Sequence, residues 1–141
     1  MRIEFDIPMK VFSINQMSAR DQRFKTAAYK DWATAILQFL QEMPEYKELL
    51  DMAADFKDKG GQFFVSFTAF YPPHIFYTKQ GSISSKTVDC TNFGKPLLDL
   101  IFGNTMDVND KNVVECTKRK AAGASFFIKV TIEMRPLNMR F

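Results

Sequence analysis

One polar segment, 88–99, holds the residues whose types and spacing could carry chemistry. Asp89 stands immediately before an expected helix. Asn92, Lys95 and Asp99 then recur three and four positions apart, so they share one face of that helix. The segment therefore predicts a carboxylate, an amide, an ammonium group and a second carboxylate close together in space.

A second polar segment, 108–114, places Asp110 in a turn just before an apolar strand. Two carboxylates at the ends of elements, with a lysine nearby, are the parts of a divalent-metal phosphodiesterase site. Mg²⁺ needs few protein oxygens and keeps several waters, so Asp89 and Asp110 could hold it. The metal would lower the pKa of bound water, and Lys95 could add a fixed cation that is favourable to the transition state.

Spacing alone leaves simpler interpretations open for each of these residues. Asp89 could be a capping or loop carboxylate, because acidic residues are common just before a helix. Asp110 could be a turn residue, and Lys95 could lie on a solvated helix face. A calcium loop of the EF-hand type is excluded at 107–118, because Asn112 and Lys118 occupy the positions that need glycine and glutamate.

Length and composition predict one soluble globular domain that covers residues 1–141. The chain has 46% hydrophobic and 25% charged residues, which is ordinary for such domains. The net charge of +3 permits a polyanionic partner without requiring one. No glycine-rich phosphate loop is present.

The two cysteines, Cys90 and Cys116, are too few for a disulfide framework or a zinc site. We expect both to be reduced thiols in a cytoplasmic protein. Residues 1–7 alternate between polar and apolar types, which is unlike a signal peptide. No apolar run is long enough to span a bilayer, so no membrane partner is expected.

The periodicity predicts an α+β fold, in which helices pack on a small, mixed but largely antiparallel sheet. Thr26 is the expected N-cap of the first helix, and Gly103 is the expected C-cap of the third. Residues 9–25 and 74–86 are expected to be surface loops, the latter with an edge segment. The expected helices are 27–42, 44–59 and 92–102, and the expected strands are 2–7, 62–71, 113–120 and 125–133, the last two joined as a hairpin through 121–124.

The two polar segments together resemble the RusA family of Holliday junction resolvases, which are endodeoxyribonucleases of phage and prophage origin. The family has an Asp-x-Asp-Asn-x-x-Lys segment that opens a helix, and a later Asp-Asp-x-x-Val-Val turn that leads into a strand. The matching residues here are Asp89, Asn92, Lys95, Asp99, Asn109, Asp110, Val113 and Val114. The order and spacing agree in two separated places, and the likeness extends over most of the chain.

The resemblance implies a homodimer that binds four-way DNA junctions and cuts two symmetry-related strands with Mg²⁺. Asp89 and Asp110 would bind the metal, and Lys95 would be the catalytic lysine. Four further positions would support them: Thr91, Asn92, Asp99 and Asn109. Thr91 and Asn109 stand where the family has acidic residues, so the alternative function is a non-catalytic dimer that binds branched DNA.

Basic side chains could give such a protein a salt-dependent grip on the DNA backbone. The resemblance favours this role for Lys79 and Lys86, which flank a loop rich in glycine and serine. Lys118 and Lys120 are further candidates in an expected strand. They would lie on the face opposite Arg119, since consecutive strand residues point to opposite sides. A solvated surface explains all of these residues equally well without the resemblance.

Overall fold

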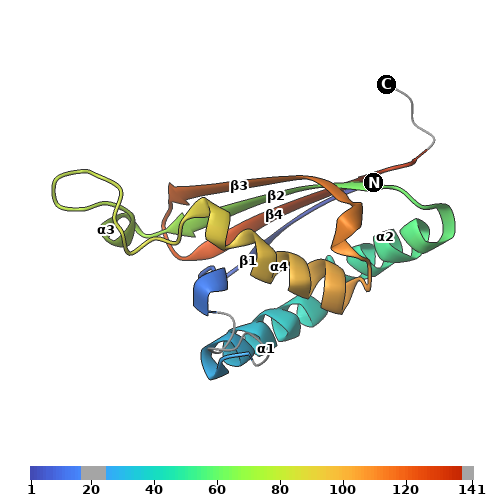
Figure 1. The fold of residues 1–141 in the computed structure, drawn as a ribbon, viewed down its shortest axis with the longest axis horizontal. Helices are drawn as coiled ribbons and strands as arrows, with labels where there is room; N and C mark the ends of the chain where they lie inside the picture. Colours follow the sequence, from blue (N-terminus) through green and yellow to red (C-terminus); the bar gives the residue numbers. More distant parts are fainter. Residues whose placement is uncertain (17–24, 138–141) are drawn as a thin grey trace.

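The computed structural model describes residues 1–16 and 25–137. Four strands form one sheet in the spatial order β1-β4-β2-β3, and helices lie against one side of it (Figure 1). β4 pairs antiparallel with both β1 and β2, whereas β2 and β3 are parallel. The strands are β1 (Arg2–Ile7), β2 (Gln62–Tyr71), β3 (Val113–Ala122) and β4 (Phe127–Arg135). The expected α+β fold is confirmed.

The helical elements follow the chain in an order that matches the expected pattern in its first half. Thr26 caps α1, because its side-chain oxygen accepts a hydrogen bond from Tyr29 N at 3.1 Å. The α-helices are α1 (Ala27–Glu42), α2 (Tyr46–Lys59), α3 (Pro73–Phe76) and α4 (Gly94–Leu98). A π-helix, η3 (Asp99–Thr105), continues α4, and short 3-10 turns are η1 (Ile14–Gln16), η2 (Cys90–Asn92) and η4 (Asp110–Asn112).

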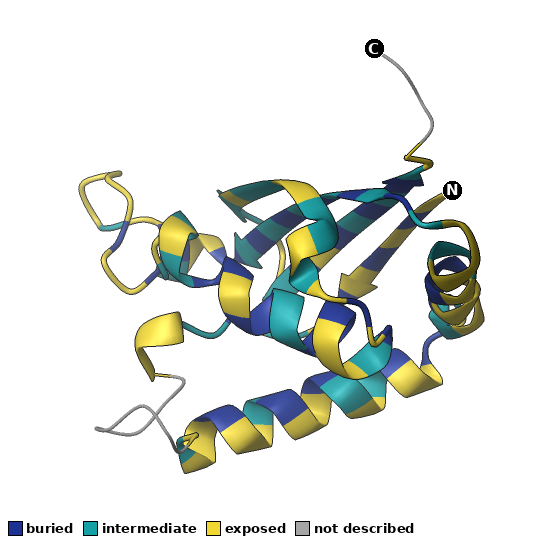
Figure 2. Ribbon diagram, turned by 45° about the vertical axis from the view of Figure 1, so that its right-hand side comes forward, coloured by how far each residue is buried: buried dark blue, intermediate teal, exposed yellow. Residues whose placement is uncertain are grey.

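The hydrophobic core lies between the helices and the inner face of the sheet. Along β1, Ile3, Phe5 and Ile7 are buried, and their neighbours in the strand are exposed. The same alternation runs along β2 and β4 (Figure 2). Because side chains alternate across a strand, this pattern gives each strand one inner and one outer face. No described helix has the length and apolar character needed to cross a membrane.

The expected hairpin between the last two strands is wrong. β3 and β4 lie on opposite sides of β2 and do not pair with each other. Four residues, 123–126, carry the chain across the end of β2, where Gly123 N donates to Tyr71 O at 2.8 Å. Glycine fits there because an added Cβ would lie 3.0 Å from the Phe70 ring. The chain does turn at the predicted place between β3 and β4. The residues of the turn do not determine, however, which strand pairs with β3.

Two further expectations about the middle of the chain need correction. Gly103 does not end the third helix, since the helical segment continues to Thr105 in the wider π geometry. Residues 73–76 form a short helix instead of an edge segment, and Tyr77 then pairs with Ile83 across a tight loop. In the first expected loop, η1 occupies 14–16, and residues 17–24, which include Arg20 and Arg23, lie outside the described part of the chain.

Candidate functional site

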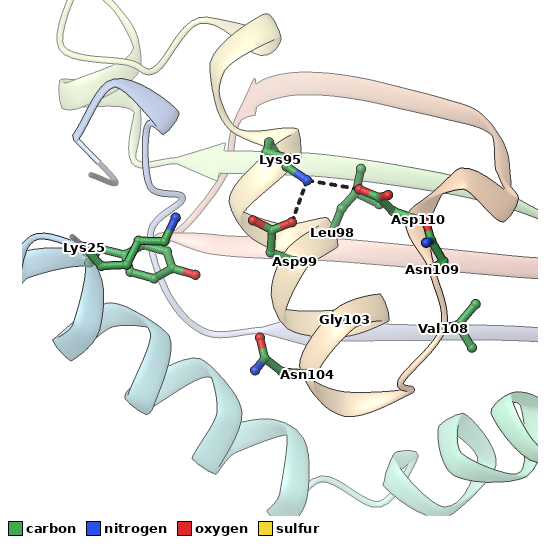
Figure 3. Close-up of a pocket in the computed structure, with 10 residues that line it drawn as sticks. Lys25, Lys95, Leu98, Asp99, Gly103, Asn104, Val108, Asn109 and Asp110 are labelled. Carbon is green, nitrogen blue, oxygen red and sulfur yellow. Dashed lines mark hydrogen bonds and ion pairs between the residues drawn. The ribbon is translucent and has the colours of Figure 1, made fainter. Parts of the chain in front are cut away.

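The two polar segments meet at the Lys95 side chain. Lys95 Nζ lies 2.8 Å from Asp99 Oδ1 and 3.1 Å from Asp110 Oδ2. Figure 3 shows the two carboxylates pointing toward the same ammonium group, one from the α4–η3 helix and one from the turn before β3. The structure thus brings together three of the residues that the sequence singled out.

The position of Asp99 follows from the helix that carries it. Lys95 and Asp99 are four residues apart, so their side chains lie on one face of the helix. Asp99 is also the first residue of η3, whose wider turns are marked by the hydrogen bond from Met106 N to Ile101 O. π-Helical turns occur frequently at functional sites, because they redirect side chains that a regular helix would place elsewhere.

The position of Asp110 is fixed by its neighbour Asn109. The Asn109 side-chain oxygen accepts a hydrogen bond from Lys111 N at 2.9 Å and so caps η4. Its backbone oxygen accepts from the Asn112 side chain at 3.1 Å. Asn109 therefore has a structural role in this turn, which the sequence pattern did not predict for it.

The electrostatics of the cluster favour a charged lysine. Hydrogen bonds to Asp99 and then to Asp110 raise the pKa of Lys95 above its ordinary value. The Lys95 side chain is 50% exposed, and those of Asp99 and Asp110 are 29% and 41% exposed. The cluster is thus open to solvent, and its groups can reach a ligand without unfolding of the surrounding chain.

A hollow of about 510 Å³ lies beside this cluster. Lys25 and Tyr29 border it from the start of α1, and the Lys25 ammonium lies 5.6 Å from the centre of the Tyr29 ring. Burial, and then the charge of Asp99, raise the pKa of Tyr29. The residues around the hollow are Lys25, Tyr29, Lys95, Leu98, Asp99, Gly103, Asn104, Val108, Asn109 and Asp110.

Sequence reasoning placed Lys25 only at the end of an expected surface loop, 9–25, and did not select Lys25, Tyr29 or Asn104 as site residues. Their contribution depends on how α1 lies against η3, which is a tertiary contact between segments far apart in the sequence. One local signal was present for Lys25, because it directly precedes the N-cap Thr26 and so had to lie at the start of α1.

Asp89 lies outside this set of residues. It is exposed and stands just before η2, and its backbone oxygen accepts from Asn92 N at 2.9 Å. Thr91 is exposed and Asn92 is half-buried in the same turn. None of these three residues borders the hollow. The structure places Asp110 and Asp99 at Lys95, and the pairing of Asp110 with Asp89 at a metal stays a prediction.

Two of the predicted DNA-binding lysines pack against the segment that leads to the site. Lys120 Nζ donates to Thr87 Oγ1 at 3.0 Å. The Lys118 side chain lies over Gly94, where an added Cβ would come within 2.7 Å of its Cδ. Lys118 and Lys120 lie beside buried residues of β2, on the inner face of the sheet. Arg119 lies on the outer face, so the expected separation of the two lysines from Arg119 is confirmed. Lys79 and Lys86 are exposed on the loop after α3.

Oxygen donors at the cluster are of the kind that Mg²⁺ prefers. Asp99 and Asp110 direct two carboxylate oxygens toward one position that already holds a cation, the Lys95 ammonium. Within residues 1–16 and 25–137, no three acidic, histidine or cysteine side chains are grouped closely enough to bind a metal together. A magnesium ion with one or two carboxylate ligands and several waters is compatible with these residues.

Two comparisons with known proteins found no match. The chain matches no protein-family model. No curated protein is similar enough to count as a relative.

Proposed function

We propose that this protein is a Mg²⁺-dependent, structure-selective endodeoxyribonuclease that resolves four-way DNA junctions as a homodimer, in the cytoplasm of a bacterial host. The observation that carries the proposal is the contact of Lys95 with both Asp99 and Asp110. It joins the two segments on which the resemblance to RusA resolvases depends. The site is also open, so a phosphodiester backbone can approach it.

Lys95 has the properties needed to stabilise a phosphoryl transition state. Its raised pKa keeps the ammonium charged at neutral pH. A fixed cation beside the scissile phosphate compensates the negative charge that develops during attack by water. The water loses a proton as its oxygen bonds to phosphorus, the bond to the departing sugar oxygen breaks, and that oxygen takes up a proton. Lys25, at the opposite edge of the hollow, is placed to contact a neighbouring phosphate.

Asp110 is the carboxylate best placed to hold the metal, with either Asp99 or Asp89 as the second. When bound, Mg²⁺ supplies a water of lowered pKa and compensates negative charge at phosphorus. Asp110 and Asp99 would then exchange part of their contact with Lys95 for the metal, which leaves the ammonium available to the phosphate. Asn109 holds Asp110 in place through the cap of η4.

The second candidate function is a non-catalytic dimer that binds branched DNA. Thr91 and Asn109 favour it, because neither supplies the negative charge of the acidic residue found there in RusA resolvases. The Asn109 oxygen is moreover engaged with Lys111 N. Fewer carboxylates should hold Mg²⁺ more weakly.

One gel experiment separates the two functions. A labelled synthetic four-way junction is incubated with Mg²⁺ or with a chelator, using the wild type, Asp89→Asn and Thr91→Asp. The nuclease proposal predicts paired nicks from the wild type that need Mg²⁺. If the wild type binds the junction without nicking it and Thr91→Asp creates nicking, the binding dimer is the correct function. Nicking by Asp89→Asn at the wild-type rate would assign the second metal ligand to Asp99.

A further inference from the structure

None of the helices in residues 1–16 and 25–137 lies on the outer face of the sheet (Figure 1). The helices lie against the inner face (Figure 1), and the outward residues of β2 are half-exposed along its whole length. Phe64 and Phe70 are among them, together with Ser66 and Thr68. An uncovered sheet face with aromatic residues is a surface that proteins commonly use for contacts.

Strand pairing arranges the outward side chains of this face in rows across the four strands. The central row holds mainly hydroxyl groups, and a charged row lies two residues away on each side of it. From β1 to β3, the central row is Glu4, Thr131, Ser66 and Thr117. The first charged row is Arg2, Glu133, Phe64 and Glu115, and the second charged row is Asp6, Lys129, Thr68 and Arg119.

The two charged rows have opposite signs on every strand that carries charge. On β3, Glu115 is in the first row and Arg119 in the second. On β4 the corresponding residues are Glu133 and Lys129, and on β1 the order is inverted, with Arg2 and then Asp6. The two charged rows are therefore complementary in charge to each other after a half-turn about the central row. Glu4, in the central row, then faces the partner's Glu4, and its ion pair with Arg2 of its own chain at 3.2 Å offsets part of that repulsion.

We infer that two copies of this chain pack outer face against outer face, about a two-fold axis that runs along the central row. The half-turn places the first charged row of one protomer over the second charged row of its partner, strand for strand. Glu115 then faces the partner's Arg119, and Glu133 faces the partner's Lys129. Arg2 faces the partner's Asp6. Each contact occurs twice, as an isologous interface requires.

The short side chains of the central row and the positions of the aromatic rings are compatible with two sheets packed face to face. Ser66, Thr117 and Thr131 are short, so two sheets can approach to the usual separation of about 10 Å. Phe70 and Phe127 stack at 4.2 Å, and the half-turn places Phe127 opposite the partner's Arg135. Arg135 already lies 4.0 Å from the centre of the Phe64 ring, so the guanidinium group would add a contact with a second ring.

The size of the face agrees with a dimer of moderate strength. Four strands about 4.8 Å apart, with six to ten residues each at about 3.3 Å, give a projected area of roughly 500 Å² per protomer. The accessible area of a corrugated surface exceeds its projection, so the interface approaches the roughly 800 Å² per partner of stable complexes.

A single-stranded nucleic acid is the other occupant that aromatic and basic residues on a sheet could suggest. The acidic residues argue against it, because Glu4, Glu115 and Glu133 would repel a phosphate backbone over half of the face. The Phe70 and Phe127 rings also stack on each other, which leaves less of their surface for bases.

This interface locates the homodimer that belongs to the proposed function, and it leaves the Lys95 cluster of each protomer on the outer side of the pair. Its test needs neither DNA nor metal. A failure of the nuclease proposal therefore leaves the interface standing, and a monomeric protein overturns the interface without deciding the chemistry.

Charge reversal on β3 tests the interface directly by sedimentation equilibrium of the full chain. Glu115→Arg places arginine opposite the partner's Arg119, and Arg119→Glu places glutamate opposite the partner's Glu115. Each single variant should raise the dimer dissociation constant by roughly tenfold or more, since like charges then meet at two positions. Among the described residues, neither side chain makes a hydrogen bond or ion pair within its own chain, although Glu115 and Arg135 attract each other. Thermal melts of both variants therefore accompany the sedimentation to check that each one folds.

Two further samples test whether Glu115 faces the partner's Arg119, as opposed to an effect of net charge alone. The double variant, with both reversals in one chain, should recover the dimer. An equimolar mixture of the two single variants should form heterodimers, because every facing pair is again opposite in sign. Asp51→Arg and Lys47→Glu are matched controls on the exposed side of α2 and should sediment as the wild type does.

A wild type that stays monomeric at about 100 μM, well above the dissociation constant of a stable dimer, overturns the inference. So does a dimer that both single reversals leave intact. If the protein is monomeric and Arg119→Glu weakens its binding of a single-stranded oligonucleotide, the face is a nucleic-acid surface instead.

Discussion

Lys95 Nζ lies 3.1 Å from Asp110 Oδ2, and this contact joins a helix residue to the turn that opens β3. The same ammonium also contacts Asp99 at 2.8 Å. Exposed ion pairs between a lysine and carboxylates generally contribute little to stability. This cluster also borders an open hollow, so a chemical role for its three side chains can be tested.

Asn109 should act as a positioning residue for Asp110. We expect Asn109→Ala to lose the cap of η4 and to lower the rate of junction nicking by roughly tenfold, since Asp110 is then no longer held in place. Asn109→Asp keeps the oxygen that accepts from Lys111 N and should retain at least the wild-type rate. Equal losses in both variants would show that the cap is irrelevant to activity. The rate is measured at saturating Mg²⁺ and again over a Mg²⁺ titration.

The raised pKa of Lys95 predicts how its contribution to stability depends on pH. Because the folded-state pKa lies above the unfolded value of about 10.4, the stabilisation is present in full below that pH. It decreases as the pH rises through the folded-state pKa. The difference in melting temperature between the wild type and Lys95→Met should be constant from pH 6 to 9 and should shrink above pH 10. A difference that shrinks below pH 9 would contradict the ion pairs seen here.

Thr26 should stabilise the start of α1, which carries Lys25 and Tyr29 to the hollow. Thr26→Ala removes the acceptor for Tyr29 N and should lower the free energy of unfolding by about 1 kcal/mol. Thr26→Ser keeps a hydroxyl at the same position and should recover most of that stability. Urea unfolding followed by circular dichroism measures both, and identical midpoints for alanine and serine would contradict the capping role.

Lys79 and Lys86 should contribute to DNA binding without affecting the fold, because both side chains are exposed. We expect Lys79→Ala and Lys86→Ala each to weaken junction binding and to reduce its salt dependence. The slope of log K against log salt should change by about 0.9 for each phosphate that the variant no longer neutralises. Lys47→Ala, on α2, is the control and should bind as the wild type does. An unchanged slope in both loop variants would place the DNA elsewhere.

Local patterns in the sequence predicted much of this fold. The alternation of Ile3, Phe5 and Ile7 identified β1 and its inner face, and Thr26 identified the start of α1. These features depend on neighbours in the chain, so the sequence is sufficient to find them. The same holds for Lys95 and Asp99, whose contact follows from helical spacing.

Features that depend on distant parts of the chain could not be predicted in the same way. The pairing of β3 with β2, in place of a hairpin with β4, is decided by which strands bury their inner faces together. The residues that contact Asp110 could not be predicted either, because the turn that carries Asp110 meets α4 only in the tertiary fold. For that reason the sequence did not identify Asp99 as the second carboxylate at Lys95, and the pairing of Asp110 with Asp89 at a metal stays a prediction.

The most direct measurement is the nicking of a four-way junction by Asp110→Asn, with Asp107→Asn as the matched control. Asp107 precedes Asp110 by three residues, and its side chain is exposed. Among the described residues its one ion pair is with Lys57 at 3.4 Å, and a surface contact of this kind contributes little to stability. The proposed chemistry predicts that Asp110→Asn loses nicking by about a hundredfold or more while binding the junction as tightly as the wild type, or more tightly, and that Asp107→Asn nicks normally. Undiminished nicking by Asp110→Asn, with Mg²⁺ present, would contradict the proposed site.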